Sequence, residues 1–216
     1  MERNRSEIIS MLTDQGLIAV VRARSSEQIT PLSEALISGG ITAIEITMTT
    51  PDAIGAIRKA RQAFGSRALI GVGTVLNAET CQAALQAGAE FVVTPVCRTE
   101  LVRLAHGAGR PIMLGSYSPT EAQTAHEAGA DFIKIFPADT LGPAYIKALL
   151  APLPHLRLVP TGGLDLHNIR DFMKAGCAAV GLGSSLVSSS VLQNSAWPEL
   201  TLKAGEFVRA FREIKR

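Results

Sequence analysis

The chain has 216 residues, of which 47% are hydrophobic and 19% charged, and its formal net charge is +2. A chain of this size and apolar content can bury a substantial core, and no composition shift or long linker divides it, so we expect one domain over residues 1–216. The nearly neutral charge, without a basic face interleaved with aromatic residues, argues against a nucleic-acid-binding protein.

Signals for secretion, membranes and metals are also missing from the sequence. Residues 1–5 lead into a charged segment without the apolar region of a signal peptide, and the uncharged residues 175–198 hold too many glycines and serines for a membrane span. Three widely spaced cysteines, Cys81, Cys97 and Cys177, predict reduced thiols in a cytoplasmic protein. The histidines are scattered and no metal-ligand spacing is present, so we expect no metal and no cofactor.

Short apolar runs alternate with segments of helical period along the chain. After a helix predicted at about 4–14, we expect strands at 17–22, 43–47, 68–73, 91–94, 111–114, 132–136, 157–160 and 178–182. Helices are expected near 26–38, 51–64, 77–87, 98–108, 118–128, 142–151, 166–175 and 197–215. Eight strand–helix units predict a closed (β/α)8 barrel, the TIM-barrel architecture, with an extra N-terminal helix.

An internal repeat marks four of the helix–strand junctions. Each junction has a small residue and then a glycine, namely Gly40, Gly88, Gly129 and Gly176, and a predicted strand follows. Glycine is the residue expected where a helix ends. The four junctions introduce the second, fourth, sixth and eighth strands, which share layers inside such a barrel.

Lys134 lies in the middle of the apolar run at 132–136. Phe132 and Phe136 project to the same face, so the amine should be partly shielded from water. Such an amine can give up its proton and attack a carbonyl carbon. The strand alone leaves open a structural lysine held in a salt bridge.

Counting the same offset from each junction glycine places Glu45, Val93, Lys134 and Gly181 in one layer of the barrel. The second and sixth strands face each other, so Glu45 and Lys134 should point at one another across the axis. The alternative is a buried ion pair in which the two charges only neutralise each other and bind no ligand. We favour a functional pair, because the strand ends, where barrel active sites lie, are two residues above it and the small neighbours leave room for a ligand.

The ends of the seventh and eighth strands suggest a phosphate site. Gly162 and Gly163 follow one strand, and Gly183 and Ser184 follow the other. In such barrels these two loops and the N-terminus of a short extra helix commonly bind phosphate through backbone N–H groups. We expect Ser184 to add a hydroxyl and to open that helix. Tight turns are the alternative interpretation of the glycines.

Two further strand ends offer polar groups at the same mouth. Gly73 can expose backbone N–H groups, and Thr74 carries a hydroxyl. Arg22 is a permanent cation and a candidate to pair with an anion. A bare turn and a solvated arginine are the alternatives.

Together these motifs resemble the 2-keto-3-deoxy-6-phosphogluconate and 4-hydroxy-2-oxoglutarate aldolase family of class I lyases, over about residues 15–187. The motifs are Ile44-Glu45-Ile46-Thr47, Gly71-Val72-Gly73-Thr74-Val75, Thr94-Pro95, Lys134-Ile135-Phe136-Pro137-Ala138, Thr161-Gly162-Gly163 and Gly183-Ser184. The resemblance implies that Lys134 forms a Schiff base and that Glu45 is the general acid/base. It also implies that Thr74 binds the pyruvyl carboxylate, that Pro95 and Phe136 shape the pocket, and that the glycines of the last two strand ends and Ser184 hold the phosphate.

The implied reaction cleaves 2-keto-3-deoxy-6-phosphogluconate, a small phosphorylated 2-keto acid, to pyruvate and glyceraldehyde 3-phosphate, with 4-hydroxy-2-oxoglutarate as a second substrate. The family also implies a homotrimer. Some members carry an arginine where this chain has Thr49, and members without it tend to have the arginine seen here as Arg22. Thr161 is similar to the gluconate type, since galactonate-type relatives tend to have valine, and Leu114-Gly115 stands where many members read Pro-Gly.

Three alternatives stay open. The first is an aldolase for the galactonate-derived substrate, and the second is a metal-free isomerase or epimerase acting on a sugar phosphate. The third is a non-catalytic sensor of phosphorylated sugar acids, in which Lys134 only pairs with an anion.

Overall fold

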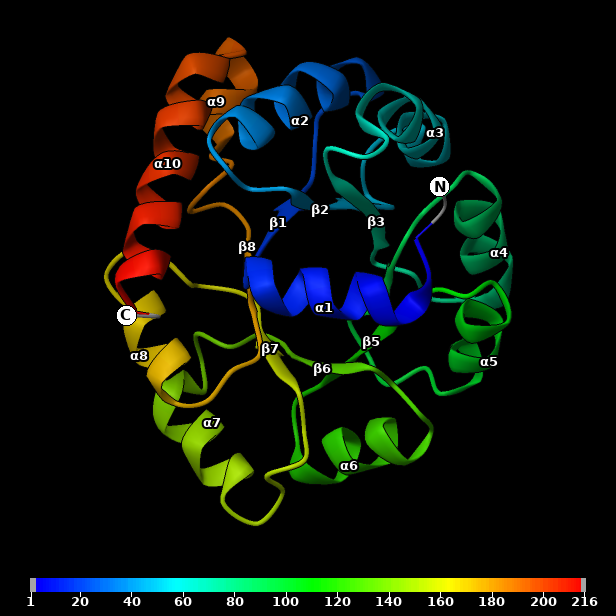
Figure 1. Cartoon of the computed structure of the whole chain (residues 1–216), viewed down its shortest axis with the longest axis vertical. Helices are drawn as coiled ribbons and strands as arrows, with labels where there is room; N and C mark the ends of the chain where they lie inside the picture. Colours follow the sequence, from blue (N-terminus) through cyan, green and yellow to red (C-terminus); the bar gives the residue numbers. More distant parts are fainter. Residues whose placement is uncertain (1–2, 215–216) are drawn as a thin grey trace.

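The computed structural model describes residues 3–214, within which eight parallel strands and their helices form a barrel (Figure 1). Neighbouring strands pair in the order β7-β6-β5-β4-β3-β2-β1-β8. A parallel bridge between Thr161 and Gly181 connects β7 with β8, the two strands at the ends of this order, and so closes the barrel. The predicted (β/α)8 barrel with an extra N-terminal helix is therefore confirmed.

The element bounds follow the predicted ones closely. The strands are β1 (Leu17–Val21), β2 (Ala43–Thr47), β3 (Leu69–Gly73), β4 (Val92–Val93), β5 (Ile112–Ser116), β6 (Phe132–Ile135), β7 (Leu158–Pro160) and β8 (Val180–Leu182). The helices are α1 (Arg5–Gln15), η1 (Ser26–Gln28), α2 (Ile29–Ser38), α3 (Ala53–Phe64), α4 (Ala78–Gln86), α5 (Glu100–Gly107), α6 (Pro119–Glu127), α7 (Gly142–Leu150), α8 (Ile169–Lys174), α9 (Ser189–Asn194) and α10 (Trp197–Ile214). The expected helical residue 215 lies outside the described residues.

Three elements differ from expectation, and the first is the predicted helix 26–38, which begins as the 3-10 helix η1 before α2. The predicted strand 111–114 continues as β5 to Ser116, because Gly115 and Ser116 pair with Lys134 and Ile135 of β6. The short extra helix expected to open at Ser184 is α9, which begins at Ser189 instead. It begins after Ser188, whose hydroxyl accepts the N–H of Val191 at 3.2 Å and so satisfies a free donor of the first turn.

The four junction glycines have the backbone conformation that the repeat predicts. Gly40, Gly88, Gly129 and Gly176 have φ values of 94°, 98°, 95° and 103°. This positive-φ region is accessible to glycine at little cost, so each glycine can reverse the chain from the end of a helix into a strand.

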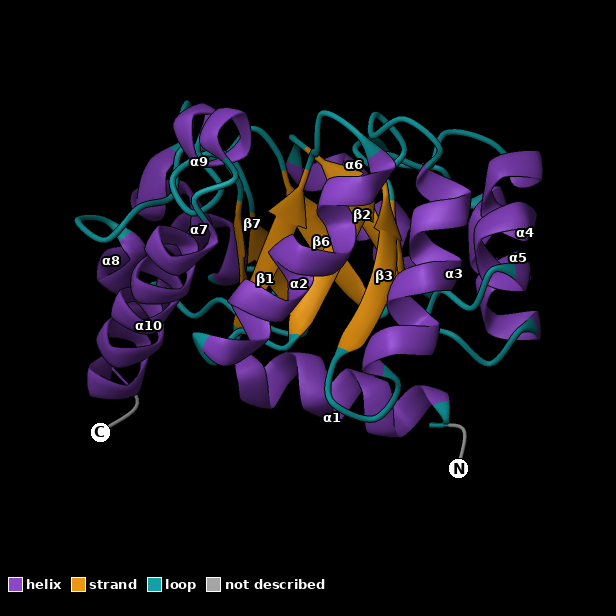
Figure 2. Cartoon of the chain, turned by 90° about the horizontal axis from the view of Figure 1, so that it is seen from above, coloured by secondary structure: helices purple, strands orange, loops and turns teal. Residues whose placement is uncertain are grey.

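The barrel interior is filled below the level of Lys134 by apolar side chains. They include a layer formed by Ala43, Phe91, Phe132 and Ala179, together with Ile8 and Leu12 from α1. Figure 2 shows α1 lying across the end of the barrel at which the strands begin. The N-terminal helix therefore closes the lower end of the barrel, and the opposite end stays open for a site.

Two buried carboxylates hold the start of α1 against the barrel. Arg3 Nη1 lies 2.7 Å from Glu90 Oε1, and Arg5 Nη2 lies 2.7 Å from Asp131 Oδ1. Both acids occupy the same place in the internal repeat, two residues after a junction glycine, and their side chains are 1% and 3% exposed. Asp131 also contacts His106 Nε2 at 3.0 Å. The repeat thus supplies two anchors for one N-terminal segment.

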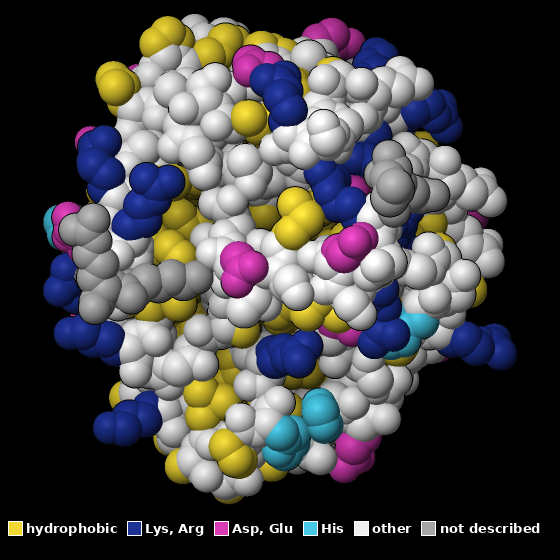
Figure 3. All heavy atoms as spheres, in the orientation of Figure 1, with side chains coloured by type: hydrophobic (Ala, Val, Ile, Leu, Met, Phe, Trp, Pro, Cys, Tyr) yellow, Lys and Arg dark blue, Asp and Glu magenta, His cyan; other side chains and the backbone are white. Residues whose placement is uncertain are grey.

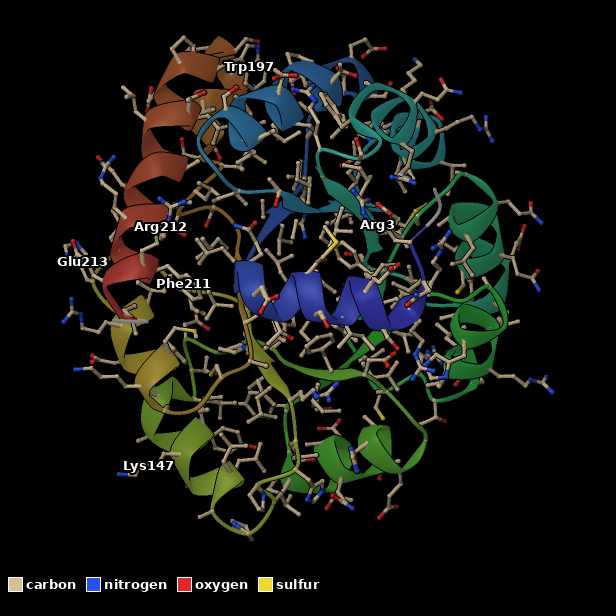
Figure 4. All side chains as sticks on the ribbon, viewed as in Figure 1. Arg3, Lys147, Trp197, Phe211, Arg212 and Glu213 are labelled. Atoms are coloured by element: carbon tan, nitrogen blue, oxygen red, sulfur yellow. The ribbon has the colours of Figure 1, made fainter. Side chains whose placement is uncertain are left out.

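The other end of α1 rests on α10. Gly16 ends α1 with φ 65°, and the ring of Phe211 occupies the space where a side chain at this position would lie. Figure 4 labels Arg3 and Phe211 near the two ends of α1. The helix is therefore fixed at both ends.

The surface on the α1 side mixes basic, acidic and apolar side chains (Figure 3). Of the helices in residues 3–214, none combines the length and the apolar character that a membrane crossing requires.

Candidate active site

Lys134 and Glu45 meet inside the barrel. Lys134 on β6 and Glu45 on β2 place Nζ and Oε1 3.5 Å apart, with side chains 7% and 3% exposed. Side chains of a strand alternate between its two faces, and both residues stand at inward positions above the apolar layer. At 3.5 Å the contact is at the outer limit of a hydrogen bond, so the carboxylate holds the amine only weakly.

The aromatic ring of Phe136 lies near the Lys134 amine. Lys134 Nζ lies 5.6 Å from the centre of the ring, a distance at which an ammonium is attracted to an aromatic face. Phe136 is itself 40% exposed. It therefore borders the site, as predicted from its place two residues beyond Lys134.

A cavity of about 610 Å³ opens at the carboxyl ends of the strands. Seven of the predicted site residues line it: Arg22, Phe136, Thr161, Gly162, Gly163, Gly183 and Ser184. Thr47, two residues beyond Glu45 on β2, is also in the lining. The buried pair therefore lies one layer beneath the walls of this cavity.

The glycines after β7 and β8 give one side of the cavity a bare backbone. Gly162 and Gly163 have φ values of 98° and 70°, so both need the freedom of glycine. A side-chain carbon at Gly183 would meet no atom within 4 Å, and this glycine therefore faces open space. An anion could approach these peptide N–H groups closely.

Ser184 lines the cavity, but it does not open a helix. Residues 183–187 form a turn in which the N–H groups of Leu186 and Val187 donate to Gly183 O at 3.0 and 2.9 Å. The extra helix α9 begins five residues later, at Ser189. The expectation that Ser184 would start that helix was wrong, because the turn that begins there is not continued beyond Val187 and Ser188 caps the helix instead.

Sequence reasoning missed three polar residues in the lining, Asp165, Ser185 and Ser189. Two of them are engaged within the loops: Asp165 accepts the N–H groups of His167 and Asn168 at 2.8 and 3.1 Å, and the Ser185 hydroxyl donates to Leu164 O. These contacts shape the loops after β7 and β8. For Asp165, the sequence did contain a signal: an Asp three residues before an Asn and just ahead of a helix is a spacing at which side chains bond to the local backbone.

Thr74 has an unusual backbone at the end of β3. Its φ of 60° is left-handed, a conformation that costs a β-branched residue on the order of 1–3 kcal/mol. The residue is half-buried directly after Gly73, whose backbone is buried beside Glu45. Pro95, after β4, is also half-buried, and its carbonyl packs against Gly115. The structure places Gly73, Thr74 and Pro95 at the strand ends but not among the lining of the main cavity.

Arg22 and Thr49 occupy the other side of the mouth. Arg22 is exposed, lines both the main cavity and a neighbouring hollow, and forms no hydrogen bond or ion pair with residues 3–214. Thr49 lines only the neighbouring hollow. Its hydroxyl lies 2.8 Å from that of Thr47, so it borders the main cavity through Thr47 and not directly.

None of the histidines and cysteines of residues 3–214 is in the lining of the main cavity. Within residues 3–214, no set of three or more His, Cys, Asp or Glu side chains is placed to hold a metal. The rings of His126 and His155 lie 4.5 Å apart, a contact that the sequence did not suggest. Burial raises the pKa of Cys81 to about 11 and that of Cys177 to about 12. These two thiols are therefore poor nucleophiles near neutral pH.

Comparison with known proteins decides the family. The model of the KDPG and KHG aldolase family matches residues 8–202. The chain belongs to the KDPG and KHG aldolase family. The chain is 38% identical to the 2-dehydro-3-deoxy-6-phosphogalactonate aldolase of Escherichia coli K12 over 91% of its own length and 95% of that protein. It is 33% identical to the 2-dehydro-3-deoxy-phosphogluconate aldolase of Pseudomonas aeruginosa over 100% of its length and 98% of that protein.

A solved structure of the same family adds a chemical comparison. The KDPG aldolase of Legionella pneumophila was crystallised with pyruvate captured at low pH as a covalent carbinolamine intermediate. It superposes on 91% of this chain and 96% of its own with a TM-score of 0.85 and 30% identity. The predicted family resemblance is therefore confirmed, and the members of this family named above are aldolases.

Proposed function

We propose that this family member cleaves a phosphorylated 2-keto-3-deoxy sugar acid through a Schiff base on Lys134, with Glu45 as the general acid/base. The observation that carries the proposal is the buried Lys134–Glu45 pair, 3.5 Å apart beneath a cavity with a glycine-lined wall. The covalent carbinolamine in the Legionella relative supports an amine nucleophile.

The chemistry follows from the two side chains. The neutral amine of Lys134 attacks the C2 ketone, and loss of water gives a protonated imine that withdraws electrons from C3. Glu45 removes the proton of the C4 hydroxyl as the C3–C4 bond breaks, which leaves an enamine and releases the aldehyde. Protonation at C3 and hydrolysis of the imine then release pyruvate.

The cavity walls suggest how the substrate is held. The bare backbone at Gly162, Gly163 and Gly183 would receive the phosphate, with the hydroxyl of Ser184 beside it. The hydroxyl of Thr74 would hold the pyruvyl carboxylate, and Arg22 would be a second partner that carries a positive charge. Pro95, Phe136 and Thr161 would shape the pocket, and Gly73 and Thr49 would border it.

Trapping the imine tests the proposal. The protein is incubated with pyruvate and reduced with borohydride, and peptides are analysed by mass spectrometry for an adduct on Lys134. Lys147 offers a matched control, because it projects from α7 into solvent (Figure 4). We expect K147A to trap pyruvate like the wild type and K134A to trap none. An unmodified wild-type protein would refute the Schiff-base mechanism and leave an isomerase or a sensor.

Substrate preference between the gluconate- and galactonate-derived acids needs a direct comparison. Thr161 supports the gluconate type, whereas the Escherichia coli galactonate-type relative has the higher identity of the two described above. We propose the gluconate-derived acid, with 4-hydroxy-2-oxoglutarate as a second substrate. A pyruvate-release assay with all three compounds tests this, and a higher kcat/KM for the galactonate-derived acid would favour the alternative.

We also propose that the chain acts as a homotrimer. Leu76, Val96 and Tyr117 follow β3, β4 and β5 and are 45%, 47% and 46% exposed. Large apolar side chains gathered at one end of a barrel are suited to contact with another subunit. Light scattering should give the mass of three chains for the wild type, and a monomer would refute this assignment.

A further inference from the structure

Gly73, the last residue of β3, lies against the carboxylate of Glu45. A side-chain carbon built at Gly73 would overlap Glu45 Oε1 and would lie 2.6 Å from both Cδ and Cγ. The strand itself is fixed at this point, since Thr47 is the register partner of Gly73 and Met48 N donates to Gly73 O at 2.8 Å. The end of the Glu45 side chain therefore occupies the space that any other residue at position 73 would fill.

The backbone of Gly73 does not itself require glycine. Its φ lies outside the positive region in which Gly162 and Gly163 are found, so an alanine could adopt the same conformation. The atoms it would meet belong to the far end of a flexible side chain. A methyl group at this position should therefore displace the Glu45 carboxylate and leave β3 in place.

We infer that Gly73 is a positioning residue for Glu45. Its missing side chain lets the carboxylate fold over β3 to the point 3.5 Å from Lys134 Nζ. The inference rests on the proposed function, in which Glu45 moves protons at a Schiff base, and it gives Gly73 a role different from substrate contact. A misplacement of about 1 Å in an active-site group can cost on the order of 10² in rate.

Proton exchange on pyruvate isolates this role. In the imine of pyruvate on Lys134, the Glu45 carboxylate takes a proton from the C3 methyl group. The C–H electron pair becomes the C2=C3 bond of the enamine, and the imine π pair returns to nitrogen. Deuteron return at C3 in heavy water, followed by hydrolysis, gives deuterated pyruvate. The methyl signal in proton NMR measures this step, while borohydride trapping measures imine formation separately.

We expect G73A to trap pyruvate on Lys134 to near the wild-type extent and to exchange the methyl protons at least tenfold more slowly. E45Q should show the same split. The double variant E45Q/G73A should exchange no more slowly than E45Q, because both changes remove the same effect, proton transfer by the Glu45 carboxylate. G71A is the matched control, since its methyl group also enters the barrel from β3 but meets the ring of Phe91. Its exchange rate per trapped imine should equal that of the wild type.

Three results would overturn the inference. They are wild-type exchange in G73A, loss of imine trapping in G73A, and a further large loss in E45Q/G73A relative to E45Q. A wild-type protein that traps no pyruvate is a different result, because it would refute the proposed function and not the role of Gly73 alone.

Discussion

Truncation of Leu12 tests whether α1 closes the lower end of the barrel. Leu12 is fully buried among the apolar side chains inside the barrel. Leu12→Ala removes three carbon atoms, a transfer loss of about 2.4 kcal/mol at about 0.8 kcal/mol each. The cavity left behind adds to this, so we expect the free energy of unfolding to fall by about 3 kcal/mol, within the observed range for such changes.

Urea unfolding measures this loss. For a chain of this size the slope m is near the upper end of the usual range, about 3 kcal/mol per M, so the midpoint should fall by about 1 M with m unchanged. The single tryptophan, Trp197, and far-UV circular dichroism should give coincident transitions. Leu202→Ala is the control, since Leu202 is 71% exposed on α10 and should change stability by less than about 0.5 kcal/mol.

The same variant separates stability from chemistry. The apolar layer that holds Leu12 lies below the Lys134–Glu45 pair, so folded Leu12→Ala protein should still trap pyruvate. A loss below about 1 kcal/mol, less than half the transfer value, would show that α1 does not complete the core. A folded variant unable to form the imine would show that α1 shapes the site.

Three other predictions concern the Asp131 anchor, the backbone of Thr74 and the thiol of Cys97. Asp131→Asn should lower the free energy of unfolding by about 2 kcal/mol, because it weakens the hydrogen bonds that a buried carboxylate accepts from Arg5 and from Ile112 N. Glu34→Gln at an exposed pair with Arg67 should cost less than about 1 kcal/mol, and equal losses in urea unfolding would contradict this. Thr74→Gly should be about 1 kcal/mol more stable than Thr74→Ala, since both lose the hydroxyl but only glycine relieves the left-handed backbone. Cys97, half-buried with its pKa raised by burial and by nearby acids, should be the first thiol alkylated in native protein. The rate should rise with pH as more thiolate forms, and labelling of Cys177 first would refute the assignment.

The part of the site that could be predicted from the sequence depends on the alternation of side chains between the two faces of a strand. Once Lys134 is taken as inward, the spacing from the junction glycines fixes Glu45 at the same level, and the structure places the two side chains in contact. Contacts that depend on the direction of a side chain could not be predicted from the sequence. The packing of Glu45 over Gly73 depends on a rotamer that no repeat or spacing encodes.

Long-range ion pairs and short turns could not be predicted from the sequence either. Arg3 and Glu90 are 87 residues apart, and neither shows in the sequence which partner it will meet. The loop after β8 contains Gly183, Ser184 and Ser188, any of which could start a helix by composition alone. The helix begins after Ser188, whose hydroxyl accepts the N–H of Val191.

The N-terminal anchors impose an order on folding during synthesis. Arg3 and Arg5 leave the ribosome before their partners, because Glu90 and Asp131 follow 87 and 126 residues later. At about 5–20 residues per second, the second partner arrives roughly 6–25 s after the first arginines. The segment that carries Arg3 and Arg5 must therefore wait, and both of its anchors can form only after residue 131 has been made.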